Sequence, residues 1–236
     1  MKKDTLSYSA LSQFSKSPNH LLSYWNRDFK PTPAMLYGSL LHKMILQPET
    51  FSDIYAVYEG TRRGAVWNEF KELNEDKSIV TQKEYNHAFK TFKKAKENKV
   101  FRKLLMQTNE AEKHIEWKYN GINYHGFCDM VGGDFIADIK TCQDAGDKFQ
   151  RELKYGDYSL QAAMYLTGLP KKNYYIIAIE KCEPYNVQVY KLGDQMLHYA
   201  TQRYNKLNEQ YKEWNGEPQS YSDGIITIGE NEFVNF

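Results

Sequence analysis

The chain has 236 residues, of which 41% are hydrophobic and 26% are charged. These values exclude a disordered chain and suit one folded domain, with or without a helical elaboration. The formal net charge is +1, so overall charge does not argue for nucleic-acid binding, and the three cysteines form no CxxC pair that indicates a zinc site or a disulfide framework.

The first half of the chain is predicted to be mainly helical. Ser9 is a candidate cap for a first helix, and Pro18 must kink or split that helix. A buried helix follows, with the sequence AMLYGSLLHKMIL, in which His42 is the only histidine. The elements expected after the first helix are helices over residues 34–46, 62–73 and 82–105, and a strand over residues 51–59.

The second half begins with three short runs rich in β-branched and aromatic residues. Asn120-Gly121 and Gly132-Gly133 separate these runs and are typical hairpin turns. We therefore expect an antiparallel three-strand meander, which makes the chain an α/β protein. The elements expected after the meander are a helix over 159–167, strands over 174–180 and 187–192, and an amphipathic helix ending near Trp214.

The sequence contains no internal repeat and no linker rich in Pro, Gly or Ser. We expect one domain over 1–236, with a mainly helical part over 1–105, a core over 110–215 and a loop-like tail over 216–236. A membrane helix needs ~20 apolar residues, and neither such a stretch nor a signal sequence is present. We therefore expect a cytoplasmic protein of a bacterial or phage-infected cell, without membrane contact.

The meander carries acidic residues where its strands are expected to be apolar. Asp129 lies near the end of the second strand, and Asp138 and Lys140 share one face of the third. A hairpin brings Asp129 and Asp138 close together, where two negative charges repel each other. A divalent cation relieves this repulsion, and oxygen ligands favour Mg²⁺, with Mn²⁺ able to replace it.

The pattern D-x-K is weak by itself, because a surface ion pair on a strand is the commoner explanation. Beside a metal, however, Lys140 can position or deprotonate a water molecule and offset charge on a phosphate. Glu116 in the first strand can reach the same site, and Gln161 and Tyr165 share one helix face. His42 is either an ordinary core residue or a contributor from a distant helix.

In chain order these residues resemble the RecB-type branch of the PD-(D/E)XK nuclease superfamily, and most closely the exodeoxyribonuclease VIII (RecE)-like phage exonucleases. The opening LSYSALSQFSKSPNHLL also resembles the first helix of this branch. The resemblance covers about residues 5–192. The matching residues are His42, Glu116, Gly126, Asp129, Asp138, Lys140, Gln161 and Tyr165.

The resemblance implies a restriction-endonuclease-like core, in which helices flank a central mixed sheet, and an N-terminal helical elaboration. It implies that His42, Asp129, Asp138 and the backbone carbonyl of Ile139 bind the metal. Lys140 is then the catalytic lysine. Gln161 and Tyr165 orient this lysine or the DNA backbone, and Glu116 serves as an outer or second-metal acid.

The implied activity is 5′-to-3′ exonuclease action on linear double-stranded DNA, which leaves 3′ overhangs for recombination. The implied partners are DNA ends, a single-strand annealing protein and further copies of the chain in a ring-shaped homo-oligomer, expected to be a tetramer. The alternatives are an endonuclease or single-strand nuclease of the same superfamily, and an inactive DNA-binding module.

Two basic segments are candidate phosphate contacts. Residues 83–103 contain eight Lys or Arg and two Glu, and Arg62 and Arg63 precede a glycine. A solvated helix face explains the longer segment equally well, and a surface that follows the DNA backbone is the alternative. We name Arg62, Arg63, Lys93 and Lys94 as candidate DNA contacts.

Overall fold

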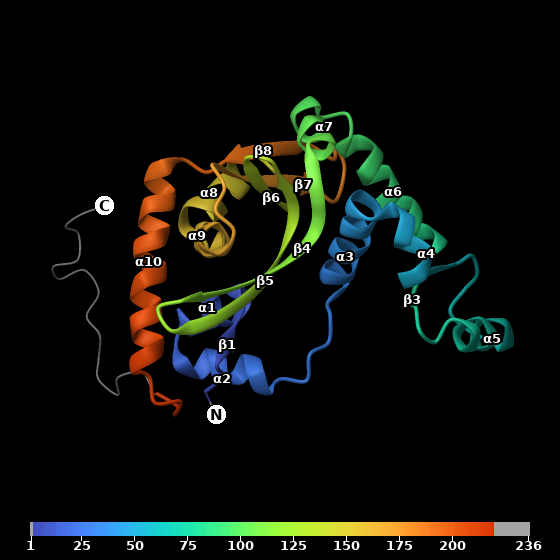
Figure 1. Ribbon diagram of the computed structural model, residues 1–236. Coiled ribbons are helices and arrows are strands. Elements are labelled where there is room, and N and C mark those ends of the chain that lie inside the picture. The colour runs from blue at the N-terminus through green and yellow to red at the C-terminus, as the bar shows by residue number, and fades with distance from the viewer. Residues whose placement is uncertain (1, 220–236) are drawn as a thin grey trace.

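The computed structural model describes residues 2–219, and residues 220–236 of the expected tail lie outside the described part. Its centre is a six-stranded sheet in the order β1-β5-β6-β7-β8, with β4 paired to β5 (Figure 1). The β1–β5 and β6–β7 pairs are parallel and the others are antiparallel, which confirms the expected mixed sheet. Its strands are β1 Thr5–Leu6, β4 Thr108–Tyr119, β5 Ile122–Gly132, β6 Phe135–Cys142, β7 Asn173–Glu180 and β8 Val187–Lys191.

Strand β5 has three neighbours. It pairs with β4 along its whole length, and its first residues also pair with β1. Its pairing with β6 is limited to Met130↔Ala137 and Val131↔Ile136. Beyond the first of these pairs the two strands separate, and Asp129 and Asp138 are the next residues on each strand. The sheet therefore opens where the two acids lie.

The turn between β4 and β5 follows its sequence. Asn120 and Gly121 have φ angles of 47° and 83°, which are the positive values that a two-residue hairpin of this type requires. The expected meander β4-β5-β6 is thus present. Residues 51–54, expected to start a strand, are helical instead, and the strand is limited to β2 Tyr55–Tyr58.

Capping residues explain where several helices begin. Ser7, and not the expected Ser9, caps the first helix. Ser17 and Thr32 cap the next two, and each is followed by a proline in the first turn, where proline costs no hydrogen bond. The helices are α1 Tyr8–Phe14, α2 Pro18–Asn26, α3 Pro33–Leu46, α4 Phe51–Ile54, α5 Ala65–Leu73, α6 Gln82–Ala95, α7 Lys99–Met106, α8 Asp147–Tyr155, α9 Tyr158–Gly168 and α10 Asp194–Glu213.

The helix expected over residues 82–105 is two helices. The Asn98 side chain accepts hydrogen bonds from the backbone N–H groups of Val100 and Phe101, both at 3.0 Å, and so starts α7. Its amide nitrogen also donates to the backbone oxygen of Val187 on β8 at 2.9 Å. Asn98 therefore redirects the chain and fastens α7 to the edge of the sheet.

Both faces of the sheet are covered. On one face, Ile136 and Ile176 pack in a cluster with residues of α1, α8, α9 and α10. On the other, Ile139 and Ile177 pack with residues of α3 and α7. The alternation along β6 places Asp138 on the α9 side and Ile139 on the α3 side, as expected from strand geometry.

A small second unit extends from α3 and α6. Here β2 pairs in parallel with β3 (Ser78–Thr81), and α5 lies between the two strands in sequence and projects outward (Figure 1). The sequence did not predict β3 or this second sheet. Within the described residues, no helix is long and apolar enough to cross a membrane.

Replacing Asn98 with Ala is expected to lower the free energy of unfolding by about 0.5–2 kcal/mol, because α7 loses its cap. Urea unfolding measures this loss as a lower midpoint with an unchanged slope. Asn86→Ala is the matched control, because Asn86 is exposed and bonds only to Gln82 of its own helix. Equal stability of the two variants would contradict the assigned role.

Candidate active site

Asp129 lies where β5 and β6 separate, and its side chain joins the two strands. Its Oδ2 atom accepts a hydrogen bond from the backbone N–H of Ile139 at 2.7 Å. The residue is only 8% exposed. The carboxylate thus takes the place of a backbone acceptor at the point where the β5–β6 ladder has ended, which fixes its position on the α3 side of β6.

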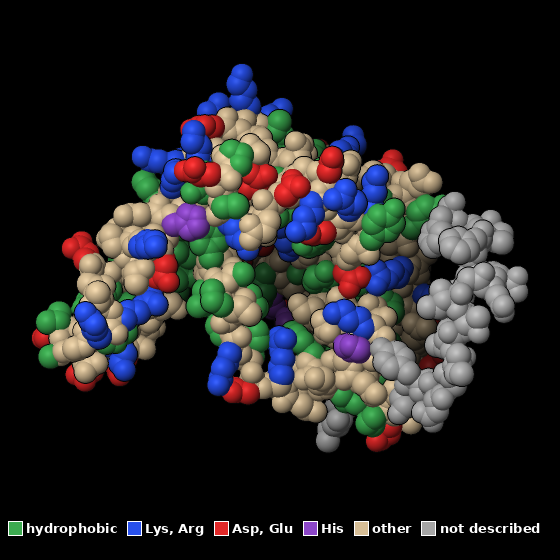
Figure 2. Space-filling model, turned by 180° about the vertical axis from the view of Figure 1, so that it is seen from behind, with side chains coloured by type: hydrophobic (Ala, Val, Ile, Leu, Met, Phe, Trp, Pro, Cys, Tyr) green, Lys and Arg blue, Asp and Glu red, His purple; other side chains and the backbone are tan. Residues whose placement is uncertain are grey.

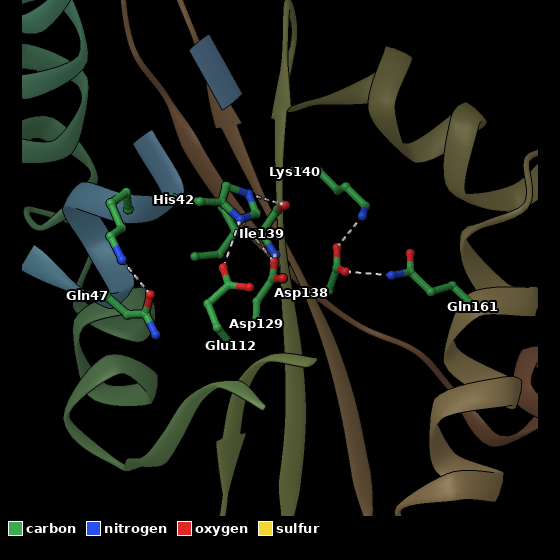
Figure 3. Close-up of polar contacts among 9 residues, drawn as sticks. His42, Gln47, Glu112, Asp129, Asp138, Ile139, Lys140 and Gln161 are labelled. Carbon is green, nitrogen blue, oxygen red and sulfur yellow. Dashed lines mark hydrogen bonds and ion pairs between the residues drawn. The ribbon is translucent and has the colours of Figure 1, made fainter. Parts of the chain in front are cut away.

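Helix α3 brings His42 to the same point. His42 Nε2 lies 3.0 Å from the backbone oxygen of Ile139. A carbonyl oxygen can only accept, so Nε2 carries the hydrogen and the ring orientation is fixed. Nδ1 then faces two carboxylates, with Asp129 Oδ2 at 3.6 Å and Glu112 Oε1 at 3.8 Å (Figure 3).

These three side chains form a group suited to a divalent cation. The candidate ligand atoms of His42, Glu112 and Asp129 all lie within 4.8 Å of one another. One imidazole nitrogen and two carboxylate oxygens are ligands that Mn²⁺ and Mg²⁺ accept. Metal-bound histidines commonly donate their second N–H to a backbone carbonyl, as His42 does to Ile139. The residues present therefore fit a metal ion.

The electrostatics of the group also favour a cation. Burial raises the pKa of Asp129, and the negative charge of Asp138 raises it further. Burial lowers the pKa of His42, but hydrogen bonding to Glu112 and the nearby acids outweigh this effect, and the pKa rises above its ordinary value. Neighbouring acids contribute to both shifts, and a bound cation would relieve the repulsion between these acids.

Asp138 and Lys140 lie on the other side of β6. Asp138 is 3% exposed. Its Oδ1 atom accepts a hydrogen bond from Gln161 Nε2 of α9 at 2.8 Å, and its Oδ2 lies 2.7 Å from Lys140 Nζ (Figure 3). Burial lowers the pKa of Lys140, but the adjacent Asp138 outweighs it and raises the pKa above its usual range. Lys140 therefore remains a cation.

Tyr165 is positioned by Gly126. A Cβ atom at position 126 would lie 2.6 Å from the Tyr165 ring, so only glycine lets the ring of α9 lie against β5. Burial raises the pKa of Tyr165, and Asp138 raises it further. The tyrosine thus remains neutral beside the acid.

Most of the residues predicted from the sequence lie around this opening of the sheet, but in two groups separated by β6. His42 of α3 and Asp129 lie on one side of β6. Asp138, Lys140 and Gln161 of α9 lie on the other side (Figure 3). The two carboxylate oxygens of Asp138 lie against Lys140 and Gln161. The metal-binding role expected for Asp138 stays a prediction.

One other expectation stays a prediction and one needs revision. The carbonyl of Ile139, expected to be a metal ligand, accepts a hydrogen bond from His42, and its second lone pair can still accept a metal. Glu116 is not brought to the site. Its side chain is 75% exposed and lies 4.0 Å from His114, and four strand residues span ~13 Å. Glu112 occupies the expected place, with a φ angle of 50° that marks an irregularity in β4.

The sequence did not single out two residues of this region. Glu112 was missed because the irregularity at its position is not readable from strand alternation. Tyr158 was missed although it begins the same helix as Gln161 and lies three residues before it, which is one helical turn. Its ring centre lies 5.7 Å from Lys140 Nζ.

The candidate DNA contacts are exposed side chains of the second unit and α6. Arg62 donates to Glu84 and to the backbone oxygen of Ile79, both at 2.9 Å, so it supports the start of α6. Lys94 pairs with Glu97 at 3.0 Å. A role for Arg62, Arg63, Lys93 and Lys94 in DNA binding stays a prediction.

Comparisons with known proteins concern the family and the fold of the chain. A family model described as "PDDEXK-like domain of unknown function (DUF3799)" matches residues 7–224. A crystal structure from Eubacterium rectale, described as a "Putative exonuclease", is similar with a TM-score of 0.61 at 16% identity, over 88% of this chain and 82% of that one. The structure of SSO0001 has a TM-score of 0.36 at 12% identity, over 88% of this chain and 77% of that one. No curated protein matches the sequence significantly.

Glu112 and Glu116 offer a matched test of the metal site, because both are glutamates of β4. Glu112→Gln is expected to weaken Mn²⁺ binding about tenfold or more, since a carboxylate ligand is lost, and Glu116→Gln is expected to leave it unchanged. Isothermal titration calorimetry gives both affinities. The assignment fails if Glu116→Gln loses affinity while Glu112→Gln retains it.

Proposed function

This chain belongs to the DUF3799 family of PDDEXK-like domains, and from that premise we propose that it is a metal-dependent DNA nuclease. The family match confirms the PD-(D/E)XK superfamily predicted from the motifs. The main support for the proposal is that two groups of side chains lie on either side of β6. One group, with His42, Glu112 and Asp129, suits a cation, and the other holds the charged Lys140.

Each group suits one part of phosphodiester hydrolysis. A divalent cation, when bound, activates water and polarises the phosphate. His42, Glu112 and Asp129 would hold it, and the hydrogen bond from His42 to Ile139 would keep the imidazole in place. Mg²⁺ is the proposed ion, because both acids supply hard oxygen ligands.

Lys140 is proposed to act as a fixed positive charge. Its ammonium group, which is paired with Asp138, would hold the attacking water or offset the charge that develops on the phosphate. Asp138 holds the ammonium group at 2.7 Å, and Gln161 in turn fixes Asp138. Tyr165 completes this wall of the site from α9.

We further propose that the substrate is linear double-stranded DNA, degraded from its 5′ end to leave 3′ overhangs. The resemblance of the motif order to RecE-like exonucleases supports this. The solved structure with the similar fold is itself described as a "Putative exonuclease". A role in recombination, a tetrameric ring and a single-strand annealing partner belong to the same proposal.

Asp138→Asn and Lys140→Ala are each expected to reduce cleavage of DNA in Mg²⁺ by about 10²-fold or more, because the charge at the phosphate is no longer offset or held in place. Gel analysis of an end-labelled duplex measures the loss, and circular dichroism checks the fold. Cleavage at the wild-type rate by either variant would rule out this centre.

Linear and covalently closed circular duplexes distinguish an exonuclease from an endonuclease. Linear DNA is expected to disappear progressively from its ends, while closed circular DNA remains intact, because the proposed enzyme needs a free end. Equal rates on both substrates would leave the metal chemistry standing and refute the exonuclease assignment.

A further inference from the structure

The hairpin of β4 and β5 exposes an aromatic ring next to the metal-binding group. Phe127 is 52% exposed, although its neighbours Gly126 and Cys128 are buried in the sheet. A phenylalanine on a strand face usually packs against other apolar groups. Side chains alternate across a strand, so the Phe127 ring lies on the outer face of the hairpin and is accessible to a ligand.

Two histidine rings continue from Phe127 along the hairpin. His114 is the cross-strand partner of Phe127, and the two ring centres are 4.8 Å apart. His125 follows, with its ring centre 6.2 Å from that of His114. We name Phe127, His114 and His125 the ring track.

The ring track begins at the candidate active site. Phe127 lines a cavity of 570 Å³ together with His42, Glu112, Lys43, Ile54 and Tyr55. Figure 2, which draws the molecule from behind, shows a hollow near the centre of the face that it draws. A phosphodiester placed in the metal-binding group would therefore have its neighbouring nucleotides in the same cavity as the Phe127 ring.

We propose that the ring track binds the unpaired bases of the DNA strand that is being cut, with Phe127 stacking on a base beside the scissile phosphate. The identity of the ligand rests on the proposed nuclease function. The track itself is defined by the exposed rings and by the cavity that Phe127 shares with His42 and Glu112.

The side chains of the ring track favour binding of DNA bases over binding of the DNA backbone. Aromatic side chains stack on every base and so bind single strands without sequence preference. Bases within a duplex are already stacked on one another, so only an unpaired base can offer its face. Glu116 lies 4.0 Å from His114, and its carboxylate repels phosphate from this part of the hairpin.

Binding of single strands tests the proposal separately from cleavage. The full-length protein is titrated in EDTA against a short fluorescent oligothymidylate and against an abasic oligonucleotide of the same length, and fluorescence anisotropy gives both affinities. The variants are Phe127→Ala, Phe127→Leu, which keeps an apolar side chain without a ring, and Phe127→Trp. Tyr199→Ala is the control, because Tyr199 is 60% exposed on α10.

Phe127→Ala and Phe127→Leu are expected to bind oligothymidylate about fivefold or more weakly, since one stacking contact is lost. Phe127→Trp and Tyr199→Ala are expected to retain it, and the abasic strand is expected to bind all five proteins equally. Unchanged binding of oligothymidylate by Phe127→Leu, or an equal loss on the abasic strand, overturns the ring track. The nuclease function fails separately if the protein does not cleave DNA in Mg²⁺. In that case the Phe127 variants would still bind oligothymidylate more weakly than the wild-type protein does.

Discussion

The two backbone groups of Ile139 hold the candidate site together. The N–H of Ile139 donates to Asp129, and its carbonyl accepts from His42. The Ile139 side chain is 1% exposed in the core on the α3 side, and its strand pairs with β7 through Ile177. Because the strand is fixed on its other edge and by its buried side chain, both polar groups point to the opening between β5 and β6.

This arrangement depends on the early end of the β5–β6 ladder. If the two strands had continued to pair, the N–H of Ile139 would have bonded to the β5 backbone, and Asp129 would have had no donor. The separation after Met130↔Ala137 leaves the β5-facing edge of β6 unpaired from Asp138 onward. A side-chain acid and a helix-borne histidine can then satisfy it, and both are held where a cation can bind.

Because successive side chains of β6 point to opposite faces of the sheet, the charged groups around this strand lie on two sides. Residues on the α3 side of β6 meet the candidate cation-binding group, whereas Asp138 and Lys140 on the α9 side form an ion pair in which the acid is buried. Burial lowers the pKa of Lys140, but the two acids outweigh burial and keep the lysine positively charged. One strand thus has the candidate cation-binding group beside one face and a charged lysine on the other.

The sequence predicted the parts of this site that follow from periodicity. The shared face of Asp138 and Lys140, the turn at Asn120-Gly121 and the helix that carries Gln161 all depend on local rules, and the structure has them. The position of Glu112 could not be predicted, because an irregularity in β4 determines which glutamate reaches His42. The small sheet of β2 and β3 was also missed, since short strands give little alternation to detect.

Crystals of the protein soaked in Mn²⁺ would test the central claim most directly, through the anomalous scattering of the ion. The account predicts a peak bound by His42 Nδ1 and by carboxylate oxygens of Glu112 and Asp129, with Nε2 of the histidine still bonded to Ile139. An ion bound without His42, or no ion between α3 and β5, would contradict it.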